Sequence, residues 1–321
     1  MIRNKRPVKP TAILTADIHL TTRAPVARTD NIIESQQRKV AFLRDLQLRY
    51  DCPVLDSGDL FDYWKSPPWL STYAYANLPA MYTIPGNHDL PEHSLAKYDH
   101  SALHLLGATR KDISVSFIPP AIIDGVPHPT YRGPFALYSY PNGTFDYQIF
   151  DGVVKDPEYT NVLMIHEFVW PGLKPPFKDA PGYMAQALLH RLHARFDLIL
   201  CGDNHKGFVE TYEGSILVNP GCMLRLTADF IDYRPRCYLY YRESNTVVPE
   251  YYPIESGVLS TEHLDRVKAR DERIAAYIQN MNNQWEYGIS FGANLDAFFK
   301  ANNTPKLVKE LIWHYREVIN T

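Results

Sequence analysis

Residues 82–91 read YTIPGNHDLP, in which Gly86, Asn87, His88 and Asp89 directly follow an apolar run. Taken alone, such a pattern is compatible with an ordinary turn at the end of a strand. Its meaning depends on whether other strands of the chain end in the same way. The rest of the sequence therefore decides between a turn and a functional site.

Five segments share this design: a short apolar run ends in Asp, Asn or His, often just after a Gly. They are TAILTADIH (11–19), CPVLDSGD (52–59), AMYTIPGNHD (80–89), NVLMIHE (161–167) and FDLILCGDNH (196–205). Apolar runs of this length are typical of strands that are buried on both faces. Because open α/β sheets bind ligands beyond the carboxyl ends of their strands, we expect the polar residues to gather at one edge.

A helix is predicted between the first two of these strands. In the sequence NIIESQQRKVAFLRDLQLRY (31–50), the residues Ile33, Val40, Leu43 and Leu46 fall on one helical face. Asn31 and Glu34 have the spacing of a capping-box variant. The chain therefore begins with a β-helix-β unit.

Composition places limits on the rest of the chain. With 321 residues, 45% of them hydrophobic, it can bury one large α/β core and still carry an extension. The net charge of −3 and pI of about 6.5 mean that any contact with a polyanion must be local. The apolar runs are much shorter than the roughly 20 residues of a bilayer span, and the basic N-terminus lacks the apolar core of a signal peptide. Four cysteines without a CxxC pair suit reduced thiols, so we expect a cytoplasmic protein that makes no contact with membranes.

Two domains are expected, a catalytic domain over residues 1–255 and a helical C-terminal extension over residues 256–321. Two Pro-rich stretches, 117–135 and 170–182, are expected to be loops, and residues 234–254 to be a hairpin that turns at 243–245. From residue 260 onward the apolar residues follow a helical period. One stripe contains Leu264, Val267, Ile274 and Ile278, and a second contains Leu307, Val308, Leu311, Ile312 and Tyr315, which follow Thr304 and Pro305.

The polar residues at the strand ends form a set of candidate metal ligands. They are Asp17, His19, Asp59, Asn87, His88, His166, Asp203 and His205. Oxygen and imidazole donors without a thiolate suit Mn²⁺, Fe²⁺, Zn²⁺ or Mg²⁺, and two ions are needed to use the whole set. Two ions held about 3.5–4 Å apart convert a shared water into a hydroxide nucleophile near neutral pH. Such a site is suited to the hydrolysis of phosphate esters.

The order of the motifs, D-x-H, G-D, G-N-H-D, a lone strand-end H and G-x-x-H, resembles the calcineurin-like metallophosphoesterases over residues 11 to about 225. The resemblance implies an α/β fold in which a β-sandwich is flanked by helices. It also implies roles for the candidate residues. One metal would be held by Asp17, His19 and His205 and the other by Asn87, His166 and Asp203, with Asp59 as the bridge. His88 would remain unligated and act as general acid, with Asp89 orienting its ring, while Gly86 would allow the tight exit from the strand.

One position departs from the family pattern. The last motif is usually G-H-x-H, whereas this chain has Gly202, Asp203, Asn204 and His205. If Asp203 binds metal, three carboxylates surround the two ions and favour hard ions such as Mn²⁺ or Mg²⁺. If it does not, the second metal site is weaker.

Within the superfamily, the segments LDSGDLFDYWKSPP, GNHDLPEH and CGDNHKGF are most similar to the SbcD/Mre-type DNA repair nucleases of bacteria and phages. This resemblance implies Mn²⁺-dependent exonuclease or endonuclease activity on DNA in repair or recombination, often as a homodimer. It also implies a coiled-coil ATPase partner of the SbcC type, in a bacterial or phage-infected cell. Two features depart from that subtype: the extension is short, and Asp62 stands where some relatives carry a second active-site histidine.

Two other functions remain open at the sequence level. A phosphoesterase that acts on cyclic nucleotides or nucleotide derivatives would use the same metal ligands. The other alternative is a non-catalytic scaffold that binds a partner through the stripe at 307–315. An active site that has lost its catalytic activity would not need His88.

Other residues near the strand ends also have two interpretations. Aromatic side chains follow Asp59, namely Tyr63, Trp64, Trp69, Tyr73 and Tyr75. They are expected to pack within the protein, but they could instead stack on unpaired bases. The basic residues Arg23, Arg28, Lys206 and Arg225 could bind phosphates or serve as ordinary surface charges.

Overall fold

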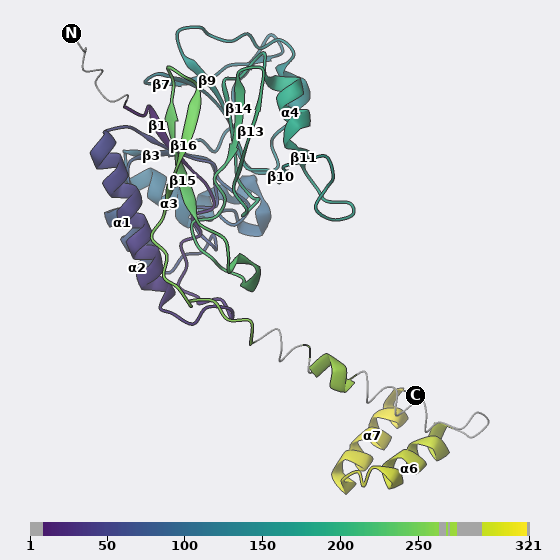
Figure 1. Cartoon of the computed structure of the whole chain (residues 1–321). Helices are drawn as coiled ribbons and strands as arrows, with labels where there is room; N and C mark the ends of the chain where they lie inside the picture. Colours follow the sequence, from purple (N-terminus) through teal and green to yellow (C-terminus); the bar gives the residue numbers. More distant parts are fainter. Residues whose placement is uncertain (1–8, 263–267, 269, 275–290, 320–321) are drawn as a thin grey trace. The chain divides into compact units, whose positions relative to one another are not determined.

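The computed structural model describes residues 9–262, 268, 270–274 and 291–319. The chain forms two compact units, residues 1–260 and residues 261–321, shown in Figure 1. The expected boundary at residue 255 lies a few residues before this division.

The first sheet of the large unit has the strand order β16-β15-β1-β2-β3-β4. These strands are β16 (Thr246–Tyr251), β15 (Arg236–Tyr241), β1 (Ala12–Thr15), β2 (Val54–Asp56), β3 (Met81–Thr83) and β4 (Ile113–Val115). β1 to β4 run parallel, and the register aligns Thr15 with Asp56 and Asp56 with Thr83. The carboxyl ends of β1, β2 and β3 therefore meet at one edge.

The second sheet has the strand order β13-β14-β12-β9-β8-β7. Its strands are β13 (Phe208–Tyr212), β14 (Ser215–Asn219), β12 (Leu198–Cys201), β9 (Thr160–Ile165), β8 (Phe135–Tyr140) and β7 (Thr130–Arg132). β8, β9, β12 and β14 are parallel, and the outer strands β7 and β13 are antiparallel. All five strands expected from the apolar runs are present, as β1, β2, β3, β9 and β12.

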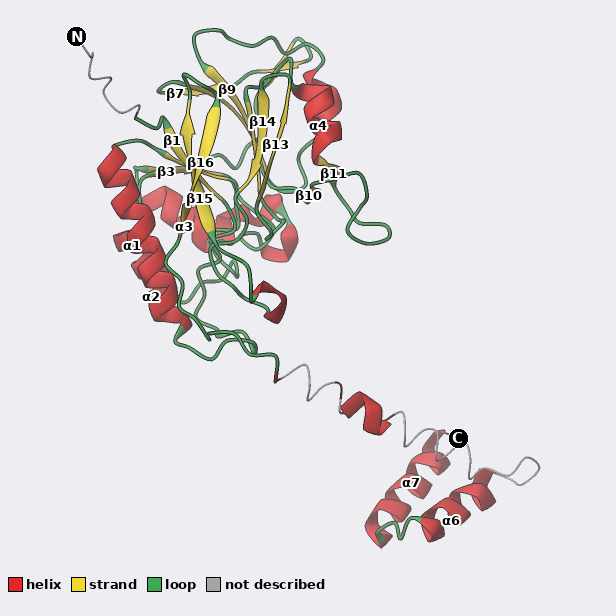
Figure 2. Cartoon of the chain, in the orientation of Figure 1, coloured by secondary structure: helices red, strands yellow, loops and turns green. Residues whose placement is uncertain are grey.

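The two sheets pack face to face and are covered by helices on their outer faces (Figures 1 and 2). Along β1, Ala12 and Leu14 pack between the sheets, while Ile13 packs toward the helices, as the two-residue period of a strand requires. The helices beside the first sheet are α1 (Ile32–Tyr50), α2 (Pro68–Asn77) and α3 (Ala102–Thr109), and α4 (Ala185–Leu192) covers the second. This arrangement confirms the expected α/β sandwich with flanking helices.

Local predictions have mixed outcomes. The Asn31 side chain accepts from the backbone N–H of Ile33 and of Glu34 and donates to the Glu34 carboxylate, so the predicted cap of α1 is confirmed. The predicted hairpin is confirmed as β15 and β16. The stretch 117–135 is not only loop: it contains the small hairpin β5 (Ile122–Ile123) and β6 (Val126–Pro127) and the edge strand β7. A Pro at such an edge costs no interior hydrogen bond.

The remaining elements are short. β10 (Val169–Trp170) and β11 (Tyr183–Met184) form a two-stranded parallel sheet around the second Pro-rich stretch. Short 3₁₀ helices occupy Pro91–His93, Leu95–His100, Tyr147–Phe150 and Ala228–Phe230. Within the described parts of the chain, no helix has both the length and the apolar character needed to cross a membrane.

The small unit contains α6 (Phe291–Ala301) and α7 (Lys306–Ile319). α7 begins directly after Thr304 and Pro305, as predicted. Its residues Leu307, Val308, Leu311 and Ile312 are exposed. Of the first apolar stripe, only Ile274 lies among the described residues, so the predictions for Leu264, Val267 and Ile278 fall outside them.

Candidate metal centre

The segments that follow β1 and β2 are held side by side by backbone hydrogen bonds. The Asp17 N–H donates to the Gly58 carbonyl, and the His19 N–H donates to the Asp59 carbonyl, both at 2.9 Å. Asp17, His19 and Asp59 are all buried. Two loops that are about 40 residues apart in the sequence therefore act as one rigid platform for the candidate ligands.

The backbone is strained at these positions. Left-handed φ angles occur at Asp17 (49°), His19 (48°), Asp59 (56°) and Asp203 (68°), none of which is a glycine. Such conformations cost on the order of 1–3 kcal/mol each and persist only where the surrounding structure fixes them. Four of them among the candidate ligands indicate that the chain is folded to point these side chains inward.

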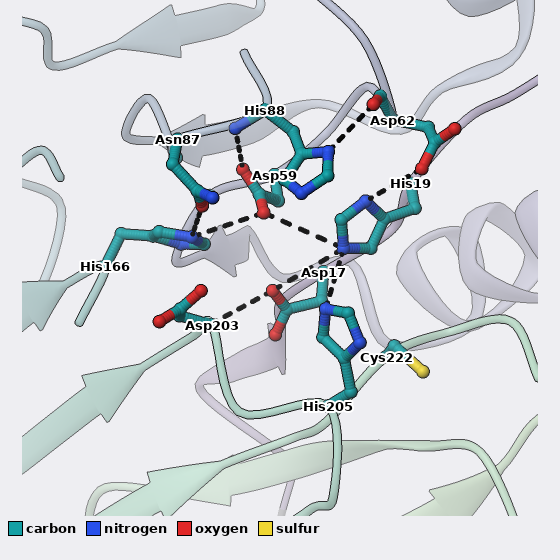
Figure 3. A network of polar contacts seen from close by, with 12 residues as sticks. Asp17, His19, Asp59, Asp62, Asn87, His88, His166, Asp203, His205 and Cys222 are labelled. Atoms are coloured by element: carbon teal, nitrogen blue, oxygen red, sulfur yellow. Dashed lines mark hydrogen bonds and ion pairs between the residues drawn. The ribbon is translucent and has the colours of Figure 1, made fainter. Parts of the chain in front are cut away.

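The first group of ligands contains Asp17, His19 and His205, whose ligand atoms all lie within 4.8 Å of one another. Figure 3 shows the two imidazoles facing each other, with Nε2 to Nε2 at 3.1 Å. The His19 Nε2 lies 3.9 Å from Asp17 Oδ1. The Nε2 lone pairs of His19 and His205 and the carboxylate of Asp17 converge on one point, which creates a site for a cation.

The second group contains Asp17, Asp59 and His166, again within 4.8 Å. His166 must donate from Nδ1 to the Ser57 carbonyl at 2.7 Å, because a carbonyl oxygen can only accept. Its Nε2 therefore faces Asn87 Oδ1 at 3.0 Å and Asp59 Oδ2 at 3.3 Å. A histidine fixed in this way by a backbone carbonyl has the tautomer and orientation of a metal ligand.

Asp59, a member of the second group, also lies close to the first. Its Oδ2 is 3.7 Å from His19 Nε2 and 3.3 Å from His166 Nε2. Its other oxygen, Oδ1, accepts from the His88 backbone N–H at 2.8 Å, so the carboxylate cannot rotate freely. This is the position that a bridging ligand requires.

Gly86 serves a different purpose from the one expected. It is not among the residues with a left-handed φ, so a tight exit does not require glycine here. A Cβ at this position would lie 2.1 Å from Asp59 Oδ1 and 2.5 Å from the Asp59 nitrogen. Gly58 and Gly202 similarly leave room for His166, since a Cβ on either would come within 2.8 Å of its Nδ1. Gly86 and Gly202 therefore provide space for ligands, whereas Gly58 provides space and also has a left-handed φ of 103°.

His88 lies beside these groups and is oriented by Asp62. Its Nδ1 donates to the Asp62 carbonyl at 2.8 Å, which leaves Nε2 as the nitrogen that can exchange a proton with substrate. The expectation that Asp89 orients this ring is wrong. The Asp89 carboxylate accepts from the backbone N–H groups of Leu60, Phe61 and Gly86, so it holds the two loops together instead.

In the sequence, Asp62 is notable only because some relatives of the resembled subtype carry a histidine at this position. In the structure its side-chain Oδ1 also lies 3.6 Å from His19 Nδ1. Asp62, His19 and His88 form a third cluster of potential ligand atoms. No sequence motif indicated that Asp62 orients His88, because a backbone carbonyl carries no residue-specific pattern.

Asp203 contacts the other predicted ligands through its backbone rather than through its side chain. Its backbone N–H donates to Asp17 Oδ1 at 3.0 Å, but its carboxylate belongs to none of the three clusters found among the described residues. Metal binding by Asp203 therefore stays a prediction.

Three of the four basic residues named from the sequence form hydrogen bonds or ion pairs within the protein. Arg28 forms a two-pronged ion pair with Asp30, and Arg225 donates to the carbonyls of Ile231 and Glu255. Both are buried and hold loops together. Lys206 pairs with Asp229 at 3.2 Å.

The electrostatics fit a bound cation. Burial raises the pKa of Asp17 and lowers the pKa of His19 to about 3. Burial also opposes the charge on Asp59, but the neighbouring His166 and His19 outweigh it and lower the pKa of this carboxyl. Asp17 Oδ2 and Asp59 Oδ2 are buried without a hydrogen-bond partner in the described structure. Buried carboxylate oxygens of this kind are costly unless a cation satisfies them, so these residues fit a pair of divalent ions.

Comparison with known proteins agrees with this geometry. Residues 11–207 match the family model described as calcineurin-like phosphoesterase. No curated protein matches the chain.

Solved structures that resemble the chain include a protein of Thermus thermophilus, with 13% identity, 77% of this chain and 100% of that chain covered, and a TM-score of 0.46. Others are a novel archaeal phosphodiesterase (11% identity, 75% and 98% covered, TM-score 0.38) and a putative 5′-nucleotidase from Staphylococcus aureus (12% identity, 82% and 58% covered, TM-score 0.40). The family match spans more than half of the chain and includes every candidate ligand. The chain belongs to the calcineurin-like phosphoesterase family.

Proposed function

We propose that this protein is a phosphodiesterase that uses two divalent metal ions, with DNA as its substrate. One observation carries the hydrolytic part of the proposal: Asp59 lies with one carboxylate oxygen between the imidazoles of His19 and His166, and His88 is held beside it. A binding scaffold would have no use for a free imidazole in this position.

The residues of the site have different roles in hydrolysis. When bound, the two ions would supply a nucleophile derived from water and neutralise charge on the phosphate. Asp59 and Asp17 set the spacing of the site, and the carbonyl of Ser57 fixes the direction of His166. His88, fixed by the Asp62 carbonyl, presents Nε2 to the departing oxygen and donates its proton there.

The proposal of DNA as the substrate rests on the resemblance of short motif segments. The segments that carry the ligands and the aromatic run after Asp59 are similar to those of SbcD/Mre-type nucleases. On this proposal the enzyme is a Mn²⁺-dependent exonuclease or endonuclease of DNA repair or recombination in the cytoplasm. With Asp203 as a third carboxylate, the ligand set would favour Mn²⁺ or Mg²⁺ over softer ions.

A coiled-coil ATPase is the proposed partner, and homodimer formation is proposed as well. The exposed apolar residues Leu307, Val308, Leu311 and Ile312 of α7 support the first of these. Replacing Leu307 and Leu311 by Glu should abolish co-purification with such an ATPase and leave simple diester hydrolysis unchanged. Unchanged co-purification would exclude α7 as the contact.

One observation favours a small-molecule substrate as the second candidate. A cavity of about 460 Å³ adjoins Asp62, and this volume falls in the range of sites for small ligands. A labelled oligonucleotide and a cyclic nucleotide, each incubated with the enzyme and Mn²⁺, separate the two candidates. Shortening or nicking of the oligonucleotide is expected, whereas turnover of the cyclic nucleotide alone would favour the second.

A further inference from the structure

A cavity adjoins the candidate metal centre at Asp62, which contacts both His88 and His19. It is lined by the segment that follows His19, including Arg23, and by the segment between Asp62 and Leu70. Asp62 belongs to both sites, because it lines the cavity and its carbonyl fixes His88. Figure 3 shows Asp62 next to His88 and His19.

This position identifies which part of a substrate the cavity would hold. In hydrolysis, the P–O bond to the leaving group breaks, water supplies the oxygen that replaces it, and the proton from His88 Nε2 goes to the departing oxygen. The leaving group must therefore lie within reach of His88. Since the cavity borders the residue that positions His88, it lies where a leaving group would extend.

An aromatic surface is available in this cavity. The Tyr63 side chain lines it and is 50% exposed. One neighbour is Trp64, at 5.4 Å between ring centroids, and the Arg23 guanidinium lies 6.0 Å from the Tyr63 ring centroid. An exposed ring supported on one side by another aromatic residue is a platform on which a planar base can stack.

Two cations accompany this ring. Arg23 and Lys65 both line the cavity, and neither forms an ion pair with a carboxylate in the described parts of the chain. The one carboxylate in the lining, Asp62, is directed toward His19 Nδ1 at 3.6 Å. Among the described residues, the lining therefore carries two cations and one carboxylate, a net excess of one positive charge.

The start of α2 does not supply an alternative anion site. Pro67 and Pro68 have no backbone N–H, and the N–H groups of Leu70 and Ser71 are already bonded to the Pro67 carbonyl. Arg23 and Lys65 are therefore the charged groups of this cavity that an anion would contact.

We propose that this cavity is a leaving-group subsite for a nucleotide, in which the base stacks on Tyr63 while Arg23 and Lys65 bind the next phosphate of the strand. The inference rests on the proposed phosphodiesterase function and deepens it. It predicts that the enzyme prefers diesters whose leaving group is a nucleotide that carries a further phosphate. A leaving group with neither a planar ring nor a second phosphate would gain nothing from the cavity.

The test compares two substrates in Mn²⁺. One substrate is a dinucleotide whose leaving nucleotide carries a terminal phosphate, and it is tested in two forms, with that phosphate at one end or at the other. The second substrate is bis(p-nitrophenyl) phosphate. Tyr63→Ala should lower kcat/KM for the dinucleotide about tenfold or more, which is the loss expected for one stacked base, and Tyr63→Phe should restore it. Arg23→Gln combined with Lys65→Gln should lower it similarly and weaken its salt dependence. The Arg23 and Lys65 change should not affect bis(p-nitrophenyl) phosphate by more than about twofold, because its leaving group carries no second phosphate.

Matched control variants are available on the same molecule. Tyr75 is equally exposed, at 51%, and does not line this cavity, so Tyr75→Ala should leave both substrates unaffected. Lys111 precedes β4, at the sheet edge opposite the metal centre, so Lys111→Gln controls for loss of a surface charge.

Binding separates this inference from the proposed function. Calorimetry with the phosphorylated dinucleotide and the Mn²⁺-loaded His88→Ala protein requires no turnover. Weaker binding after Tyr63→Ala supports the subsite, and equal binding overturns it. If the wild type hydrolyses neither substrate, the phosphodiesterase function fails, while the binding result still decides whether the cavity holds a nucleotide. Equal losses for both substrates in the Arg23 and Lys65 variant would also overturn the subsite.

Discussion

Gly86→Ala is predicted to dismantle the metal centre while leaving the fold intact. The new Cβ would lie 2.1 Å from Asp59 Oδ1, which is about 1.3 Å short of the 3.4 Å at which ordinary contact begins. The same Cβ would press on the Asp59 nitrogen, at 2.5 Å, so rotation of the carboxylate alone cannot relieve the clash. Asp59 must therefore move by about 1 Å, away from the position between His19 and His166.

Displacements of this size are large for catalysis. A misplacement of about 1 Å can reduce a rate about 100-fold, and disturbed support of a metal ligand typically costs 10–100-fold in metal affinity. We expect the variant to retain fewer than two equivalents of Mn²⁺ after dialysis and to hydrolyse bis(p-nitrophenyl) phosphate at least 100-fold more slowly. The measurements are elemental analysis and steady-state kinetics.

Gly107→Ala is the matched control. Gly107 lies in α3, and a Cβ there would crowd the Val115 side chain at 2.8 Å, while its nearest neighbours, Val115 and Tyr98, include no candidate ligand. Both variants add one methyl group in a crowded place, so only damage to the metal centre should distinguish them. If Gly86→Ala binds two equivalents of Mn²⁺ and keeps wild-type activity, Asp59 does not act as a bridge whose position matters.

Three further predictions concern individual side chains. Asp203→Ala should reduce bound Mn²⁺ by one equivalent per chain, as measured by elemental analysis, and retention of two equivalents would remove Asp203 from the ligand set. His88→Ala should lower oligonucleotide cleavage about 10²- to 10⁴-fold with metal content unchanged, and should affect bis(p-nitrophenyl) phosphate less because its leaving group needs less protonation; loss of metal would contradict the general-acid role. Burial raises the pKa of Asp56 to about 8, so its contribution to stability is present at low pH and is lost as the pH rises toward 8. Asp56→Asn should therefore remove a loss of about 3 kcal/mol between pH 5 and pH 7, measured by urea unfolding in chelator, and an unchanged pH dependence would refute this.

The sequence predicted the strands and most of the candidate ligands for one physical reason. A strand that is buried on both faces must be apolar along its whole length, so a polar residue at its end is conspicuous. The loop between β9 and β10 shows this, because His166 follows the four buried apolar residues 162–165. Asn31 could be predicted as a helix cap because capping depends on residue type and local spacing alone.

The contacts that orient the ligands could not be predicted in this way. The carbonyl of Asp62 fixes His88, and the carbonyl of Ser57 fixes His166, but every residue has a carbonyl. The role of Asp89 depends on three N–H groups that converge on its carboxylate only after folding. Gly86 was recognised as important, but the reason is the proximity of Asp59, which is 27 residues away in the sequence.

The most direct measurement is a crystal structure of the protein with Mn²⁺, using anomalous scattering to locate the ions. Two peaks about 3.5–4 Å apart are expected, one beside Asp17, His19 and His205 and one beside Asn87 and His166, with Asp59 touching both. A single peak, or peaks away from Asp59, would contradict the two-metal mechanism.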